Sequence, residues 1–185
     1  MTTNRSEMKM DANYWIDKLQ LSEHPEGGYY KETYQADITV ELQGQTRKKQ
    51  QVNQFKNKPR SISSTIYYLL KGNQVSLFHR LNYAEEMWHF YTGSSMTIYL
   101  IQETTRKFLE LKLGENSEDG EMFQVLVKHG SWFGAMINDP SSYSLVGCTV
   151  CPAFIFEDFE LANRKTLIST YPEHKAIIKK LTRSR

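Results

Sequence analysis

The sequence predicts a mainly β protein, an antiparallel barrel or jelly roll with short helices at its two ends. Strand-like runs follow one another from Tyr29 to Val150, and short glycine-bearing turns separate them. No helical pattern lies between these runs, which argues against a parallel α/β sheet. Aromatic residues make up 12% of the chain, a content that favours strands and lined pockets. At 185 residues, we expect one domain over residues 1–185.

The first part of the chain predicts an N-terminal helical arm over residues 1–22. Asp11 can cap a short helix, in which Trp15, Ile16 and Leu19 recur at helical spacing. This helix should end near Gln20. Prolines and glycines then mark a turn over residues 24–28, and a strand follows over residues 29–34.

Residues 41–60 are polar and carry six basic side chains and one acid. They lack a sustained period, so we expect a long loop or hairpin there. An anion-binding patch is one interpretation, although short charge runs are usually solvated surface. A strand rich in β-branched and aromatic residues resumes over residues 61–70.

The remaining strands follow at short intervals. Glu110 and Lys112 alternate with three leucines in one of them, which predicts a strand with one buried face. Pro172 stands at a helix start, so two short helices are expected within residues 160–185, over 162–170 and 173–181. The expected strands span residues 96–101, 108–113, 122–127, 131–136 and 143–150.

The stretch from Gly72 to Gly93 carries the main site hypothesis. His79 stands near the end of one expected strand and Glu86 near the start of the next, so a hairpin would place them on neighbouring strands. An imidazole beside a carboxylate can work as a general base, because its pKa lies near neutral pH and the carboxylate stabilises the imidazolium. The alternative is a buried structural pair.

Composition excludes several functions. The formal net charge of +2 is too small for a dedicated nucleic-acid or membrane-surface protein. There is no apolar run of membrane-spanning length, and the first ten residues are polar and charged, so we expect a cytoplasmic protein. Cys148 and Cys151 form a lone CxxC within an expected strand, where we interpret them as reduced structural cysteines.

Several motifs together resemble the cupin-5 family of the cupin superfamily. Gly72, His79, Glu86 and Gly93 fall at the spacing of the first cupin motif. HPEGGYYKETY, STIYYLL, GSWF and SLVGCTVCPAFIFEDFELANR resemble further signatures in the same order. The resemblance implies a cupin double-stranded β-helix, commonly a homodimer, with a ligand cavity inside the barrel.

The chain departs from metal-binding cupins at their second and third histidines. Leu81 occupies the second position, and Phe133 occupies the third. His89 cannot substitute if its strand is regular, because it then faces away from Glu86. Two remaining donors make a weak site, so we predict neither a metal nor another cofactor.

Three functions remain open. The first is a metal-independent epimerase or isomerase acting on a sugar or sugar nucleotide, with His79 as general base, Glu86 as its partner and a tyrosine as acid. The second is a non-catalytic binder of a sugar or another small polar metabolite. The third is a metal-dependent isomerase or dioxygenase, which the missing histidines disfavour. The tyrosine candidates are Tyr29, Tyr68, Tyr91 and Tyr99.

Further residues are candidate ligand contacts, each with a structural alternative. Trp88 and Trp132 are either pocket walls or core, and Arg80 is either a phosphate contact or half of a salt bridge. We also expect a homodimer, in which residues 29–34 add a strand to a partner's sheet. The full set of candidate ligand contacts is Trp88, Trp132, Phe133, Glu26, Tyr29, Arg80 and His89.

Overall fold

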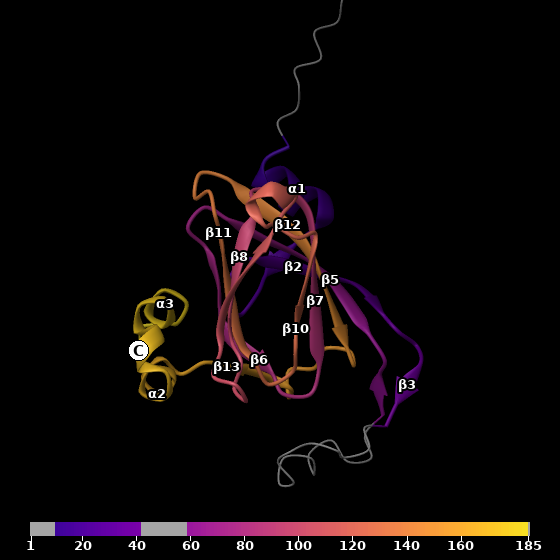
Figure 1. Cartoon of the computed structure of the whole chain (residues 1–185). Coiled ribbons are helices and arrows are strands. Elements are labelled where there is room, and N and C mark those ends of the chain that lie inside the picture. Colours follow the sequence, from indigo (N-terminus) through magenta and orange to yellow (C-terminus); the bar gives the residue numbers. More distant parts are fainter. Residues whose placement is uncertain (1–9, 42–58, 185) are drawn as a thin grey trace, which may run out of the picture.

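Two antiparallel sheets face each other and form the predicted jelly roll (Figure 1). This is a computed structural model, and it describes residues 10–41 and 59–184. The larger sheet has the strand order β1 (Ser22–Glu23), β2 (Tyr29–Gln35), β5 (Ser64–Lys71), β12 (Tyr143–Cys151), β7 (Glu85–Gly93) and β10 (Gln124–Val127). The smaller sheet has the order β13 (Phe159–Leu161), β6 (Val75–Leu81), β11 (Trp132–Ile137), β8 (Met96–Ile101) and β9 (Phe108–Leu113).

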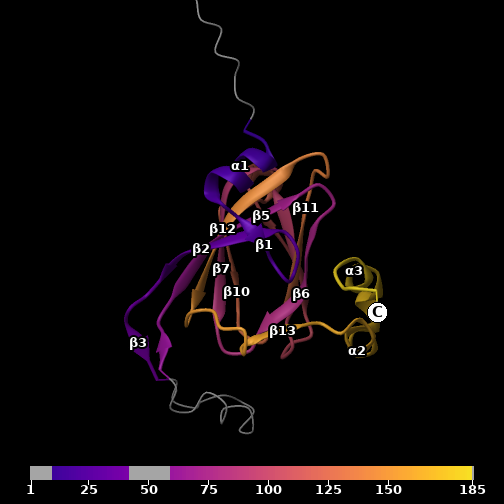
Figure 2. The same cartoon turned by 180° about the vertical axis from the view of Figure 1, so that it is seen from behind.

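A short two-stranded arm of β3 (Thr39–Val40) and β4 (Arg60–Ser61) extends from the barrel (Figure 2). The predicted loop or hairpin over residues 41–60 falls mostly on residues 42–58, which lie outside the described residues. Arg60, at its end, is buried and forms an ion pair with Asp158, with 3.0 Å between Nη2 and Oδ2. This arginine is therefore a buried structural residue of the barrel and not part of a solvated basic surface.

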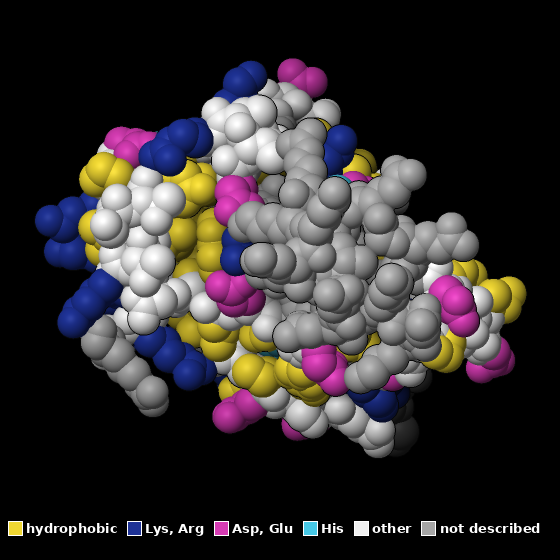
Figure 3. Space-filling model, turned by 90° about the horizontal axis from the view of Figure 1, so that it is seen from below, with side chains coloured by type: hydrophobic (Ala, Val, Ile, Leu, Met, Phe, Trp, Pro, Cys, Tyr) yellow, Lys and Arg dark blue, Asp and Glu magenta, His cyan; other side chains and the backbone are white. Residues whose placement is uncertain are grey.

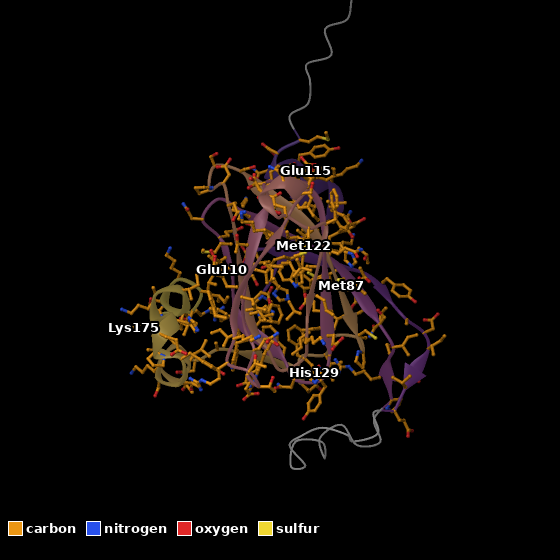
Figure 4. All side chains as sticks on the ribbon, in the orientation of Figure 1. Met87, Glu110, Glu115, Met122, His129 and Lys175 are labelled. Atoms are coloured by element: carbon orange, nitrogen blue, oxygen red, sulfur yellow. The ribbon has the colours of Figure 1, made fainter. Side chains whose placement is uncertain are left out.

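The main core fills the space between the two sheets, where side chains from both inner faces meet (Figure 4). Alternation along the strands supplies it: in β7, Glu86 and Trp88 are buried, while Met87 between them is only partly buried. Near the middle, Trp88 is edge-on to Tyr68, with ring centroids 5.7 Å apart. The largest fully buried side chains of this cluster are Trp88, Tyr68, Phe133, Leu70, Met96, Ile98 and Leu113.

The N-terminal helix α1 (Ala12–Leu19) covers one end of the larger sheet (Figure 1). Asp11 caps it by accepting a hydrogen bond from the Tyr14 N–H at 2.9 Å, and Gln20 ends it in a left-handed conformation. Trp15 packs into the cluster around Leu69 and donates from Nε1 to the Tyr143 hydroxyl at 2.9 Å.

The C-terminal elements α2 (Arg164–Thr170), η3 (Pro172–His174) and α3 (Lys175–Lys180) lie on the outer side of the smaller sheet (Figure 1). They bury Leu167 and Ile178 against the outward-facing Phe78, Ile101 and Trp132. Between β9 and β10 there is one further short element, η2 (Ser117–Asp119). No helix in residues 10–41 and 59–184 has the length and apolarity needed to cross a membrane.

Candidate functional site

The candidate site is a cavity of about 250 Å³ between the two sheets. Figure 3 shows the molecule from below, and in the described part of this lower face hydrophobic and acidic side chains are neighbours. Residues from both sheets and from the segment between β12 and β13 line the cavity. They are His24, Glu26, Tyr30, Glu32, Ser64, Ile66, His79, Leu81, Glu86, Cys148, Val150, Phe154, Phe156 and Phe159.

His79 and Glu86 both line this cavity, but they do not lie on hydrogen-bonded neighbouring strands as the sequence predicted. β6 belongs to the smaller sheet and β7 to the larger one. The chain crosses between the sheets over residues 82–84, so the two side chains approach the cavity from opposite sheets. The expected hairpin is wrong because a loop between two extended runs looks the same whether it joins paired strands or crosses a barrel.

Asp158 holds this crossing in place. It is fully buried, and its Oδ1 accepts a hydrogen bond from the Tyr83 N–H at 2.8 Å while its Oδ2 pairs with Arg60. Its backbone carbonyl also accepts from the Asn82 N–H at 3.2 Å. One buried carboxylate therefore ties the crossing to β4 and to the segment before β13.

The carboxyl group beside His79 is Glu26, not Glu86. Oε2 of Glu26 lies 3.2 Å from Nε2 of His79, and Oε1 accepts a hydrogen bond from the Ser76 hydroxyl at 3.0 Å. The turn that carries Glu26 is fixed by Gly27, whose φ of +111° favours glycine and where a Cβ would collide with the Val75 carbonyl oxygen. The Gly27 carbonyl also accepts from the Tyr68 hydroxyl at 2.7 Å.

His79 is neutral at pH 7. Burial lowers its pKa to about 4, and its hydrogen bond to the Leu77 carbonyl, 2.7 Å from Nδ1, opposes this only in part. Because Nδ1 donates to that carbonyl, the unprotonated nitrogen is Nε2. Nε2 and Glu26 are close but are not aligned as a hydrogen bond, and burial raises the pKa of Glu26. Because His79 is neutral at pH 7, this contact is not an ion pair.

Glu86 keeps its proton at pH 7. Its pKa is raised to about 8, first by burial and then by the charge of Glu26, while a hydrogen bond with the Cys148 thiol lowers it in part. Between about pH 4 and pH 8, the acid form therefore belongs to Glu86 and the base form to His79. Groups whose pKa values are pushed apart in this way can serve as an acid and a base.

Aromatic rings form much of the remaining wall. Phe154, Phe156 and Phe159 meet edge to face, with centroid distances of 5.1, 5.9 and 6.4 Å. His24 is edge-on to Tyr30 at 4.6 Å, and burial lowers the pKa of this histidine. Among the described lining residues there is no lysine or arginine.

Three predicted ligand contacts do not line the cavity: two lie in the main core between the sheets, and one lies in the cluster under α1. Trp88 is fully buried between Tyr68 and Phe133. Phe133 packs behind His79, with ring centroids 4.0 Å apart, and so supports the imidazole without lining the cavity. Tyr29 belongs to the cluster under α1, since it points to the face of β2 opposite to Tyr30.

Three others lie on outer faces of the barrel. The guanidinium of Arg80 stacks 4.4 Å above Trp132, and its Nη2 pairs with Glu160 at 2.7 Å. Trp132 is therefore the platform of a surface salt bridge and part of the contact with the C-terminal helices. His89 faces away from Glu86, as the strand alternation indicated, and lies 3.2 Å from the Thr149 hydroxyl.

Sequence reasoning missed several lining residues. Tyr30 and Glu32 could have been found from alternation in β2, because they share a face with each other and not with Tyr29. Cys148 was assigned only a structural role, yet it is buried, lines the cavity and contacts Glu86. Nothing local marks Phe154 or Phe159 as cavity walls, since the segment that carries them is irregular before β13.

The residues present do not fit a cupin metal centre. Leu81 and Phe133 stand at the second and third histidine positions, and both are buried apolar side chains without donor atoms. In the described part of the chain, no group of three or more His, Cys, Asp or Glu side chains is arranged to hold a metal ion. We therefore assign no step of any reaction to a metal.

Comparison with known proteins agrees with the fold. Residues 13–162 match the model of the family described as Cupin_5, cupin superfamily (DUF985). The chain belongs to the cupin-5 family. Among solved structures it is similar to protein SO0799 from Shewanella oneidensis, with 38% identity, a TM-score of 0.79, and coverage of 95% of this chain and 99% of the other.

Two more proteins are similar to this chain. A hypothetical protein from Leishmania major is 30% identical with a TM-score of 0.79, covering 94% of this chain and 99% of its own. The protein YML079W of Saccharomyces cerevisiae is 27% identical over 151 residues, which cover 77% of this chain and 71% of the yeast protein. These likenesses support the cupin-5 fold along most of the chain.

Proposed function

We propose that this cupin-5 protein binds a small polar metabolite without negative charge, about the size of one sugar ring, in the cavity between its sheets. The observation that carries the proposal is a cavity of about 250 Å³ in which Glu86 and His79 approach from opposite sheets, with a pKa of about 8 for Glu86 and about 4 for His79. Sites for drug-sized ligands usually measure about 300–1,000 Å³. The ligand is therefore smaller than such molecules.

The polar groups of the cavity suit hydroxyl and carbonyl partners. Glu86 can donate a hydrogen bond through its acid proton, and Nε2 of His79 can accept one. Tyr30 adds a hydroxyl to the wall. Sugars have an apolar ring face that stacks on aromatic side chains and hydroxyl groups that need partners, so the aromatic and polar halves of this lining would both be used.

A phosphate-bearing ligand such as a sugar nucleotide suits the described lining less well. The described wall offers Glu26, Glu32 and Glu86 but no cationic side chain. A phosphate brought against these carboxyl groups would lose its hydration without gaining a charged partner. The proposal therefore favours a free sugar over a nucleotide-linked one.

An isomerase is the second candidate, and the opposite placement of His79 and Glu86 favours it. Nε2 of His79 would take a C–H proton from the carbon beside a carbonyl, and Glu86 would deliver its proton to the other face. His79 would then give its proton to Glu86 through solvent to complete the cycle. A base with a pKa of about 4 abstracts protons weakly at neutral pH, so we place binding first.

The binding test compares uncharged sugars with a sugar nucleotide. D-glucose, D-fructose and dTDP-glucose are titrated into the protein while its melting temperature is followed. We expect stabilisation by at least one free sugar and none by dTDP-glucose at equal concentration. Stabilisation by dTDP-glucose alone would contradict the proposal.

Two variants locate the site. Ile66→Trp places a larger ring into the cavity and should abolish the stabilisation, because Ile66 lines the wall. Tyr67→Trp is the matched control, since Tyr67 lies on the opposite face of β5 in the cluster under α1.

The isomerase activity is tested with the same sugars in deuterated water. Deuterium incorporation beside the carbonyl, lost in His79→Gln, would establish it, and its absence for a bound sugar would leave a binding protein.

A further inference from the structure

We infer that the ligand of this cavity carries a protonated amine, which Glu86 recognises inside an aromatic wall. The inference rests on the proposed function and narrows its ligand class from non-anionic to cationic. It stands on three features of the described residues: a surplus of carboxyl groups, a buried carboxyl with an open hydrogen-bonding position, and aromatic rings around them.

The carboxyl groups outnumber the lysine and arginine side chains in the described lining of the cavity, so any net charge of this lining at neutral pH is negative. Glu26, Glu32 and Glu86 line it from the first turn, β2 and β7, and no lysine or arginine of the described wall offsets them. Glu26 and Glu86 are both more than nine-tenths buried. Buried carboxyl groups without a cationic partner are costly, so their presence together in one cavity points to a cation supplied from outside.

Glu86 is the carboxyl with room for a ligand. Glu26 is already engaged by the Ser76 hydroxyl and faces His79. Glu86 contacts the Cys148 thiol, a weak partner, and within residues 10–41 and 59–184 no nitrogen or oxygen donates a hydrogen bond to its carboxyl group. A carboxylate can accept several hydrogen bonds, so most of its capacity is unused.

The aromatic wall suits the same cation. The rings of Phe154, Phe156 and Phe159 gather at centroid distances of 5.1–6.4 Å, and Tyr30 lines the same cavity. Ring faces attract ammonium groups, more strongly where water is excluded. Carboxyl groups beside several aromatic rings are a combination that recognises amines rather than neutral hydroxyl groups.

Binding exchanges a proton for the cation. The protein's Glu86–COOH and the ligand's R–NH₃⁺ become Glu86–COO⁻···⁺H₃N–R, and one proton leaves to solvent. The titratable groups that line the cavity around Glu86 are His24 and Glu26 from the first turn, Tyr30 and Glu32 from β2, His79 from β6 and Cys148 from β12, while β10 contributes the apolar Val127. Since burial keeps the two histidines neutral and the thiol protonated, they supply no competing positive charge.

Glucamine and glucitol test the inference, because these polyols differ only by an amine in place of one hydroxyl. Isothermal titration at pH 7 should show glucamine binding at least tenfold more tightly than glucitol. Repeating the titration in phosphate and in MOPS, two buffers without a primary amine that differ in ionisation enthalpy, should show release of close to one proton per glucamine. In Glu86→Gln, the preference should fall at least tenfold and the proton release should disappear.

Glu110→Gln is the matched control, because Glu110 is an exposed carboxylate of β9 outside the cavity (Figure 4). It should behave as wild type. Equal binding of glucamine and glucitol would overturn the inference while leaving the proposed function standing. A preference for glucamine that survives in Glu86→Gln would also overturn it. Binding of dTDP-glucose with neither polyol bound would overturn the inference and the proposed function together.

Discussion

Glu86 and His79 show how burial, as the largest cause, can set which residue carries a proton. In water, a histidine holds its proton more tightly than a glutamate does. In this cavity the order is reversed, with pKa values of about 4 for His79 and about 8 for Glu86. Desolvation is the first cause in both cases, because it disfavours the imidazolium and the carboxylate alike.

This reversal predicts a pH dependence of stability that can be assigned to Glu86. Its pKa is raised in the folded state, so its contribution is fully present below the unfolded pKa of 4.5 and is lost as the pH rises through about 8. Between pH 4.5 and pH 8, the unfolding free energy of wild type should therefore fall by on the order of 3–5 kcal/mol relative to that of Glu86→Gln. About 2 kcal/mol of this loss should occur above pH 6.5.

His79 acts with the opposite sign, because its pKa is lowered in the folded state. Its contribution is present above the unfolded pKa of 6.5 and is lost as the pH falls toward 4.

Urea unfolding of wild type, Glu86→Gln and Glu110→Gln from pH 4.5 to 8.5 measures the Glu86 effect by difference. Parallel curves for wild type and Glu86→Gln would show that Glu86 is ionised in the folded protein at neutral pH.

Metal content is a second prediction at the residue scale. Leu81 and Phe133 supply no donor where metal-binding cupins have histidines, so protein purified without added metal should contain far less than one equivalent of transition metal per chain. Elemental analysis by mass spectrometry measures this. About one equivalent of zinc, iron, nickel or manganese, lost on His79→Ala or Glu86→Ala, would contradict it.

The residue scale also shows where reasoning from sequence ends. Alternation within β7 correctly turned His89 away from Glu86 and Trp88 toward the interior. The contact between His79 and Glu26 could not be derived in that way, because it joins a turn to a strand 53 positions later through the fold. The resemblance to cupins placed His79 and Glu86 in a cavity, but only the coordinates supply their surroundings.

At the scale of elements, the crossing between β6 and β7 determines the site, and Asp158 determines the crossing. Its carboxylate is fully buried and binds both the Tyr83 N–H and the guanidinium of Arg60. Removing one member of a buried ion pair leaves the other charged and unpaired, which costs about 3–5 kcal/mol.

We therefore expect Asp158→Ala to lower the unfolding free energy by roughly that amount, as measured in urea. The double variant Asp158→Ala with Arg60→Met should recover part of the loss, because it removes the stranded charge. The matched control is Asp119→Ala, a change of an exposed carboxylate in η2. A loss below about 1 kcal/mol for Asp158→Ala would show that the pair does not hold the crossing.

Most strands could be predicted because apolar alternation and glycine turns are local signals. The run over residues 108–113 is observed as β9 with the same bounds. The connection after β6 could not be predicted, since the same loop suits a hairpin and a crossing between sheets. Residues 154–158 are irregular, and the short strand β13 begins only at Phe159.

At the scale of the whole molecule, we propose a homodimer formed through β2 and the segment that leads from it to β3. β1 pairs with only Tyr29 and Tyr30, which leaves the rest of that edge of β2 without a described neighbour. From β2 to β3, the side chains of Tyr34, Ile38 and Val40 are exposed by 56%, 67% and 38%. An open strand edge beside apolar side chains is a typical site of strand addition.

Light scattering at micromolar concentration should give the mass of two chains. Ile38→Glu should shift it toward one chain, because it would place a charge in the contact, whereas Glu110→Gln should not. A wild-type mass of one chain would contradict the dimer. The cavity would be unaffected by that result, since every residue named in its wall comes from one chain.

The central claim is that the cavity holds a small polar molecule without negative charge, and the molecule carried by the purified protein tests it most directly. Wild type, Ile66→Trp and Tyr67→Trp are purified under identical conditions and denatured, and the released small molecules are identified by mass spectrometry. We predict a neutral or amine-bearing compound of sugar size with wild type and Tyr67→Trp, and its loss from Ile66→Trp. A phosphate-bearing compound retained equally by all three proteins would contradict the account.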